Sequence, residues 1–167
     1  RSLNESAIAA AQSALMLAPD LADAHSALAF ALVRGKMDVR VAREPYEQSR
    51  KLGWGDADVL IRYSDYCINV GRVREAEGST KRALLLDPLN HRVFRLLGLN
   101  QLLDGRYHDA IASIEHALAI NPKMGGAHAI ISLFYFRVGA LDKAHEAYDR
   151  ETFGLFIKTD LSIIDFK

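Results

Sequence analysis

One short ending recurs along the chain at a nearly constant interval. The segments SALMLAPDL (13–21), RALLLDPLN (82–90) and HALAINPKM (116–124) each carry an apolar run that stops at a proline. Pro88 and Pro122 are 34 residues apart, and Pro19 lies 34 plus 35 residues before Pro88. A period of this length is typical of stacked helix pairs, in which each proline ends one second helix.

The ending that this period requires near residue 54 is written differently. The sequence there is KLGWGDAD, with Trp54 in the place of the proline and glycines at 53 and 55. Glycine readily adopts the left-handed conformation that closes a helix. We therefore expect Gly53 and Gly55 to end this helix through that conformation.

The interior of each unit repeats as well. The residues before Pro88 match those before Pro122 position by position. The first set is Gly71, Val73, Ala76, Thr80 and Ala83, and the second is Gly105, Tyr107, Ala110, Ile114 and Ala117. The glycines and alanines among them lie where two helices must approach closely. The preceding halves carry a large residue, an apolar residue at +3 and a small residue at +4, which is one face of a helix.

These positions resemble the tetratricopeptide repeat (TPR) family. The best match is the unit from His91 to Pro122, at Phe94, Leu97, Gly98, Gly105, Tyr107, Ala110, Ala117 and Pro122. The resemblance implies an all-α solenoid of antiparallel helix pairs wound into a right-handed superhelix. It also implies a non-catalytic scaffold that binds other proteins.

The sequence predicts one TPR solenoid over 1–167. It consists of a partial unit at 1–21, repeats at 22–56, 57–90, 91–124 and 125–152, and a C-terminal helix at 153–167. The predicted helices span 3–17, 21–34, 38–51, 56–70, 72–85, 90–103, 106–119, 124–138 and 140–151. Pro45 falls inside the third of these, so we expect a kink or a delayed helix start near it. Gln101 replaces a tyrosine that is usual in the family, which thins that contact.

Residues 153–166 carry apolar side chains on one helical stripe. They predict a helix that caps the last repeat, as solenoid ends require; the alternative is a severed next repeat. The repeat sequences resemble the TPR region of large bacterial regulators that carry a nucleotide cyclase or a winged-helix domain. The chain starts with Arg1 rather than Met, and we expect it to belong to something larger.

Composition excludes several functions. Lys and Arg together number 21, as do Asp and Glu, so the charge excess of a nucleic-acid or membrane-surface binder is missing. The single cysteine, Cys67, has no histidine spaced to activate it and is predicted to be structural. The six histidines form no metal-ligand motif, and no phosphate-binding glycine loop occurs. We expect no catalytic residue, metal or cofactor, and a cytoplasmic location.

In the TPR family the first helix of each pair lines a concave groove. The corresponding residues here combine apolar side chains with arginines that could hold a carboxylate or a peptide backbone: Phe30, Arg34, Ile61, Asp65, Ile68, Asn69, Arg92, Arg95, Leu99, Leu102, Leu133, Phe136 and Arg137. This pattern predicts binding of a partner protein or peptide segment in the groove.

Two other interpretations stay open. The apolar residues of the groove could be covered from within by other parts of the chain. A second copy could also cover them, and the solenoid ends could support a homo-oligomer. The ends of the sequence and the resemblance of its repeats also suggest a regulatory or oligomerisation segment of a bacterial nucleotide cyclase or transcriptional regulator. The family's carboxylate clamp of paired Lys and Asn is not reproduced, so chaperone tails are not expected as ligands.

Overall fold

The computed structural model describes residues 3–36 and 38–150, and over those residues the chain is all-α. The order is α1 (Leu3–Leu17), α2 (Ala22–Lys36), a 3₁₀ helix η1 (Val39–Ala42), α3 (Arg43–Leu52), α4 (Ala57–Asn69), α5 (Val73–Leu86), α6 (His91–Leu103), α7 (Tyr107–Ile120), α8 (Ala127–Arg137) and α9 (Leu141–Asp149). Within these ranges no strand forms, which confirms the all-α prediction. The helix predicted over 153–167 lies outside the described residues.

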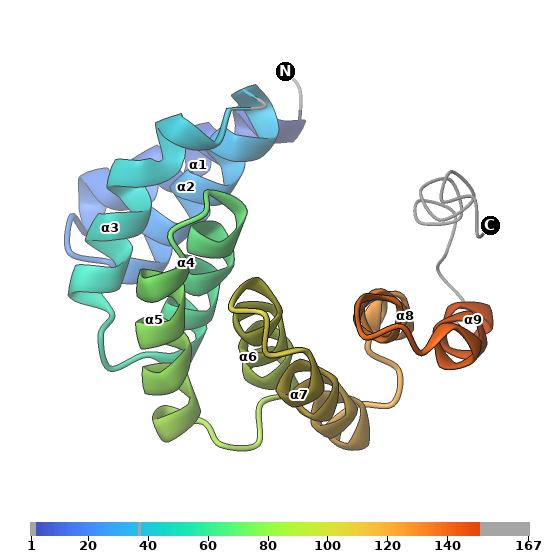
Figure 1. The fold of residues 1–167 in the computed structure, drawn as a ribbon. Coiled ribbons are helices and arrows are strands. Elements are labelled where there is room, and N and C mark those ends of the chain that lie inside the picture. The colour runs from blue at the N-terminus through green and yellow to red at the C-terminus, as the bar shows by residue number, and fades with distance from the viewer. Residues whose placement is uncertain (1–2, 37, 151–167) are drawn as a thin grey trace. The chain divides into compact units, whose positions relative to one another are not determined.

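The chain divides into two compact units, Arg1–Pro88 (unit 1) and Leu89–Lys167 (unit 2). Whether the repeats form a single solenoid domain therefore stays a prediction. Unit 1 contains α1 to α5, and unit 2 contains α6 to α9 (Figure 1). In each unit, helices that follow one another pack in pairs: α2 with α3, α4 with α5, α6 with α7, and α8 with α9.

Each unit has its own core. In unit 1, small residues from α2, η1 and α5 surround three tyrosines and Cys67: Ala29, Ala42, Tyr46, Tyr63, Tyr66, Cys67 and Ala76. In unit 2, α7, α8 and α9 bury a second cluster: Ala110, Ile111, Ile114, Ala127, Ile131, Phe134 and Ala147. Ala76 and Ala110 lie at predicted small positions, where short side chains let paired helices come close.

Buried hydroxyl groups join paired helices at equivalent places. Ser64 Oγ on α4 donates to the Ala76 carbonyl on α5 at 3.1 Å, and Ser132 Oγ on α8 donates to the Ala144 carbonyl on α9 at 2.8 Å. Each bond satisfies a polar group that burial would otherwise leave without a partner. In the pair α6–α7, the buried Gln101 amide takes this role through a 2.7 Å bond with the Ser113 hydroxyl. The replacement at position 101 therefore exchanges an aromatic contact for a hydrogen bond.

The turn inside a helix pair is the same three times. Gly71, Gly105 and Gly139 follow α4, α6 and α8 at intervals of 34 residues, with φ between 75° and 78°. After each glycine, a backbone N–H reaches back across the turn; Arg72 N donates to Cys67 O and Arg106 N to Gln101 O, both at 2.8 Å. This is the Schellman motif, which satisfies the last carbonyls of the helix.

Gly53 ends α3 by a different means from the predicted one. Its φ is −103°, so the left-handed conformation expected there is wrong. A Cβ at this position would lie 2.8 Å from a methyl carbon of Val59 on α4. Glycine is needed because α4 approaches closely, and not because the backbone turns left.

The first helix pair departs from the others at its turn. Gly35 does not stop α2 but lies inside it, and η1 precedes α3. The single helix predicted over 38–51 is thus two elements, and α3 begins at Arg43, which confirms the delayed start near Pro45. Pro45 falls in the first turn of α3, where the missing N–H has no helical partner to lose. Asp38 opens η1 by accepting a bond from Arg40 N at 2.9 Å.

Candidate functional site

The predicted groove residues of unit 1 lie on α2 and α4, the first helices of two successive pairs. These helices contact each other, and Arg62 Nη1 on α4 pairs with Asp23 Oδ1 on α2 at 2.7 Å. Phe30 is 58% exposed, and the Arg34 guanidinium lies 5.7 Å from the centre of its ring. An exposed aromatic ring beside a cation offers a partner both an apolar contact and a charge.

The remaining unit 1 candidates differ in what they offer. Ile61 is 1% exposed and presents no surface. Ile68 packs against the unit 1 core. Asn69 Nδ2 donates to the Asp65 carbonyl at 2.7 Å, which fixes the end of α4. We define the first-helix surface as Phe30, Arg34, Asp65 and Asn69, which occupy equivalent positions on α2 and α4.

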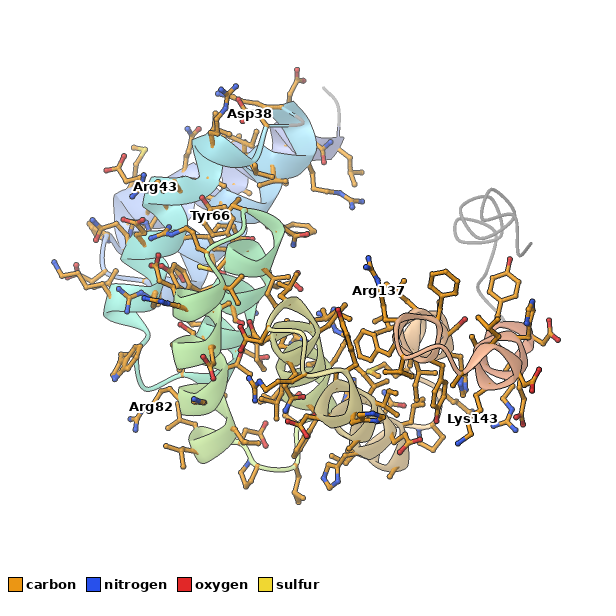
Figure 2. The ribbon with its side chains drawn as sticks, viewed as in Figure 1. Asp38, Arg43, Tyr66, Arg82, Arg137 and Lys143 are labelled. Carbon is orange, nitrogen blue, oxygen red and sulfur yellow. The ribbon has the colours of Figure 1, made fainter. Side chains whose placement is uncertain are left out.

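The unit 2 candidates lie on α6 and α8. Leu99 and Leu102 on α6 and Leu133 on α8 pack partly against the unit 2 core, so core packing accounts for much of their apolar surface. Arg92, Arg95 and Phe136 are half-buried, and Arg137 is exposed near the end of α8 (Figure 2). Unit 2 therefore packs its three leucine candidates against one core, and none of its candidates is an exposed apolar side chain.

Sequence reasoning missed a second feature, a depression in unit 1. It has a volume of about 730 Å³ and is lined by Val39 and Arg40 of η1, Arg43 of α3, Tyr66 of α4, and Val70 and Arg72 of the α4–α5 turn. We call it the arginine-lined depression. Arg43 and Tyr66 lie in the same part of unit 1 in Figure 2.

Carboxylates behind the depression hold its arginines. Arg72 Nη1 pairs with Glu47 Oε1 at 2.9 Å and Arg72 Nη2 with Glu75 Oε2 at 2.6 Å. Arg43 Nε pairs with the same Glu47 oxygen at 3.0 Å. Hydrogen bonds from Arg43 and then Arg72 hold the pKa of Glu47 below its usual value, and those from Arg72 lower the pKa of Glu75. The bond from the Arg40 side chain lowers the pKa of Asp38 to about 2.

Tyr66 forms one part of the apolar lining of the depression, beside Val39 and Val70. Its ring stacks on Tyr46 with the centroids 4.6 Å apart, and burial raises the pKa of its hydroxyl. Cys67, the next residue, is fully buried, and burial raises the pKa of its thiol. Both features fit a structural thiol, because an activated cysteine has a lowered pKa and some access to solvent.

The described residues hold neither a metal-binding cluster nor a membrane-spanning helix. Over 3–36 and 38–150, no three His, Cys, Asp or Glu side chains gather in a way that could hold a metal ion. In the same part of the chain, every helix is too short or too polar to cross a lipid bilayer.

Comparison with known proteins identifies the fold. No protein-family model matches the chain, and no curated protein is significantly similar to it. Among solved structures, PilF of Pseudomonas aeruginosa superposes with a TM-score of 0.73 at 27% identity, over 87% of this chain and 66% of that one. MamA of Desulfovibrio magneticus RS-1 matches all of this chain and 90% of its own, with a TM-score of 0.72 and 16% identity.

A third similar structure is a much longer chain. It belongs to the APC/C hetero-tetramer Cut9–Hcn1, with a TM-score of 0.76 and 16% identity over 87% of this chain and 29% of that one. These proteins are TPR proteins. The chain is therefore an all-α protein with the TPR fold. The larger bacterial regulator that the repeats resemble finds neither support nor contradiction in these comparisons.

Proposed function

We propose that this chain is a non-catalytic protein-interaction module that binds a segment of a partner protein on its first helices. The observation that carries the proposal is the first-helix surface of unit 1. There Phe30 is 58% exposed, and the Arg34 guanidinium lies 5.7 Å from the centre of its ring. Burial of an exposed aromatic ring lowers the free energy of the complex, so a partner that covers Phe30 is bound more tightly.

The fold supports the same proposal. TPR helix pairs place their first helices side by side, as the contact of α2 with α4 does here. A partner segment that lies across two such helices meets side chains at equivalent positions on each. Phe30 on α2 corresponds in this way to Asp65 on α4, and Arg34 to Asn69. The first helices of unit 2, α6 and α8, are proposed to carry a partner-binding surface of their own, made of Arg92, Arg95, Leu99, Leu102, Leu133, Phe136 and Arg137.

The test compares three proteins in affinity capture from lysate, read by mass spectrometry. They are the unmodified chain, the double variant Phe30→Asp with Arg34→Glu, and the control Leu85→Asp with Lys81→Glu. The control makes the same two kinds of change four residues apart on α5, where Leu85 is also exposed. We expect a partner that the unmodified chain and the control retain and the first variant loses. Equal capture by all three proteins would contradict the assignment of the surface.

A further inference from the structure

The arginine-lined depression has the composition of a binding site for an anion. Three of its six lining residues carry guanidinium groups, and the other three are a tyrosine and two valines. The carboxylates that pair with these arginines belong to Asp38, Glu47 and Glu75, which do not line it. The depression therefore presents positive groups to solvent although the chain as a whole is neutral.

The carboxylates behind the depression fix its arginines in place. Arg72 uses Nε, Nη1 and Nη2 on Glu75 and Glu47, and its side chain is only 24% exposed. Arg40 is held by both Asp38 oxygens. A guanidinium that is already ordered loses less conformational freedom when a ligand binds. The side-chain network thus prepares the depression for a ligand instead of filling it.

Arg43 has donors to spare. Its side chain is 67% exposed, and within the described part of the chain it gives only Nε to Glu47. Both terminal nitrogens remain able to donate. A planar guanidinium with two free N–H groups matches the two oxygens of a carboxylate.

The rest of the lining selects among anions. Tyr66, Val39 and Val70 offer an apolar floor beside the arginines, which suits an aliphatic or aromatic side chain next to the charged group. A nucleic acid would need a wider positive surface to release counterions, and Lys plus Arg only equals Asp plus Glu in this chain. A peptide that carries acidic and apolar side chains in succession meets both parts of the depression.

We propose that the arginine-lined depression binds an acidic segment of a partner protein. An Asp or Glu carboxylate of that segment accepts hydrogen bonds from Arg43 and Arg40, and a neighbouring apolar side chain packs on Tyr66. The depression shares no residue with the first-helix surface. Each of the two sites can therefore fail its test without the other.

The test is an NMR titration of the ¹⁵N-labelled full chain with a defined peptide. The probe is the acetylated and amidated heptapeptide Glu-Glu-Leu-Glu-Glu-Leu-Glu, and its matched control replaces every Glu by Gln. We expect the Glu peptide to shift the Nε–Hε signals of Arg40 and Arg43 and the amides of Val70 and Arg72. The Gln peptide should not shift them.

Two variants separate the site from general charge. Arg43→Gln should weaken binding of the Glu peptide at least tenfold, while Lys51→Gln, which removes one exposed charge from the same helix, should change it less than twofold. An equal loss in both variants would overturn the proposal, as would shifts that avoid the depression. A phosphoserine peptide or an oligonucleotide that binds there more tightly than the Glu peptide would also overturn it, because the occupant would then belong to another class.

Discussion

At the scale of single residues, particular small residues let the two helices of a pair pack close together. Gly98 on α6 shows this most directly. A Cβ built on it would lie 2.9 Å from Ile114 Cγ1 and 3.1 Å from the Ala110 carbonyl on α7. Real Cβ atoms do not approach a neighbour so closely, so α6 and α7 pack through the absence of a side chain.

Gly98→Ala is accordingly expected to destabilise the protein by about 1 kcal/mol. Overpacking costs about 1–3 kcal/mol, and the better helix propensity of Ala returns up to about 1 kcal/mol. The matched control is Gly78→Ala on the exposed side of α5, where a Cβ would meet nothing within 4 Å. That change should stabilise by about 0.5–1 kcal/mol. Urea titrations of both variants decide the matter, and an equal effect would mean that the contact of α6 with α7 is looser than described.

Residues also mark the limit of sequence reasoning. The 34-residue spacing predicts every described α-helix to within three residues at each end, apart from the start of α3, because the repeated turns punctuate the chain. It does not predict that Ile61 is buried, or that Val59 packs so close to Gly53 that a larger residue would clash there. Those facts depend on which side chain of another helix arrives at the position. The arginine-lined depression was missed for the same reason, since η1, α3 and α4 contribute to it from separate stretches.

At the scale of elements, one ion-pair network ties α3 to the turn between α4 and α5. Arg72 at that turn contacts Glu47 on α3 and Glu75 on α5, and the Tyr63 hydroxyl on α4 donates to Glu75 at 2.9 Å. The network supplies a specific link between the two pairs of unit 1.

This network predicts a dependence of stability on pH. The pKa values of Glu47 and Glu75 are lowered in the folded chain from an ordinary 4.5. Their contribution is thus complete above about pH 5 and is lost as the pH falls below 4.5 through the folded-state values. Both carboxylates are partly exposed, so we expect only about 0.5–1 kcal/mol from the pairs at pH 7.

The measurement is the urea midpoint of the unmodified chain and of Arg72→Gln between pH 7 and pH 3. The difference between them should shrink towards the acid end. Arg74→Gln, an exposed neighbour on α5, serves as the control and should differ little from the unmodified chain at any pH. A constant difference for Arg72→Gln would show that the arginine acts by packing and not by charge.

At the scale of the whole molecule, two cores divide the stability of the chain. The cluster around Tyr46, Tyr63 and Tyr66 is the core of unit 1, and the cluster around Ile114 and Phe134 is the core of unit 2. Repeat proteins are stabilised by local and nearest-neighbour contacts, so damage in one place need not spread evenly. Contacts of this local kind follow from a fold in which each helix packs mainly on the next.

Phe134→Ala removes the largest fully buried side chain in the described part of unit 2, residues 89–150, and should cost about 3–5 kcal/mol there. Hydrogen exchange followed by mass spectrometry should then accelerate in α6 to α9 more than in α2 to α5. Tyr46→Ala is the mirror variant in unit 1 and should give the reverse pattern. Uniform acceleration along the chain in both variants would mean that the two cores unfold as one cooperative block.

The buried Cys67 is a natural reporter of local opening in unit 1. It is the only thiol in the sequence, and it lies fully enclosed in the unit 1 core. A thiol reagent reaches its sulfur only when unit 1 opens around it, so the labelling rate reports the opening of unit 1: the opening rate when the reagent outpaces reclosing, and the open population when it does not. No residue has to be added or removed to install such a reporter. The opening of unit 1 can therefore be measured in the unmodified chain through this one sulfur atom.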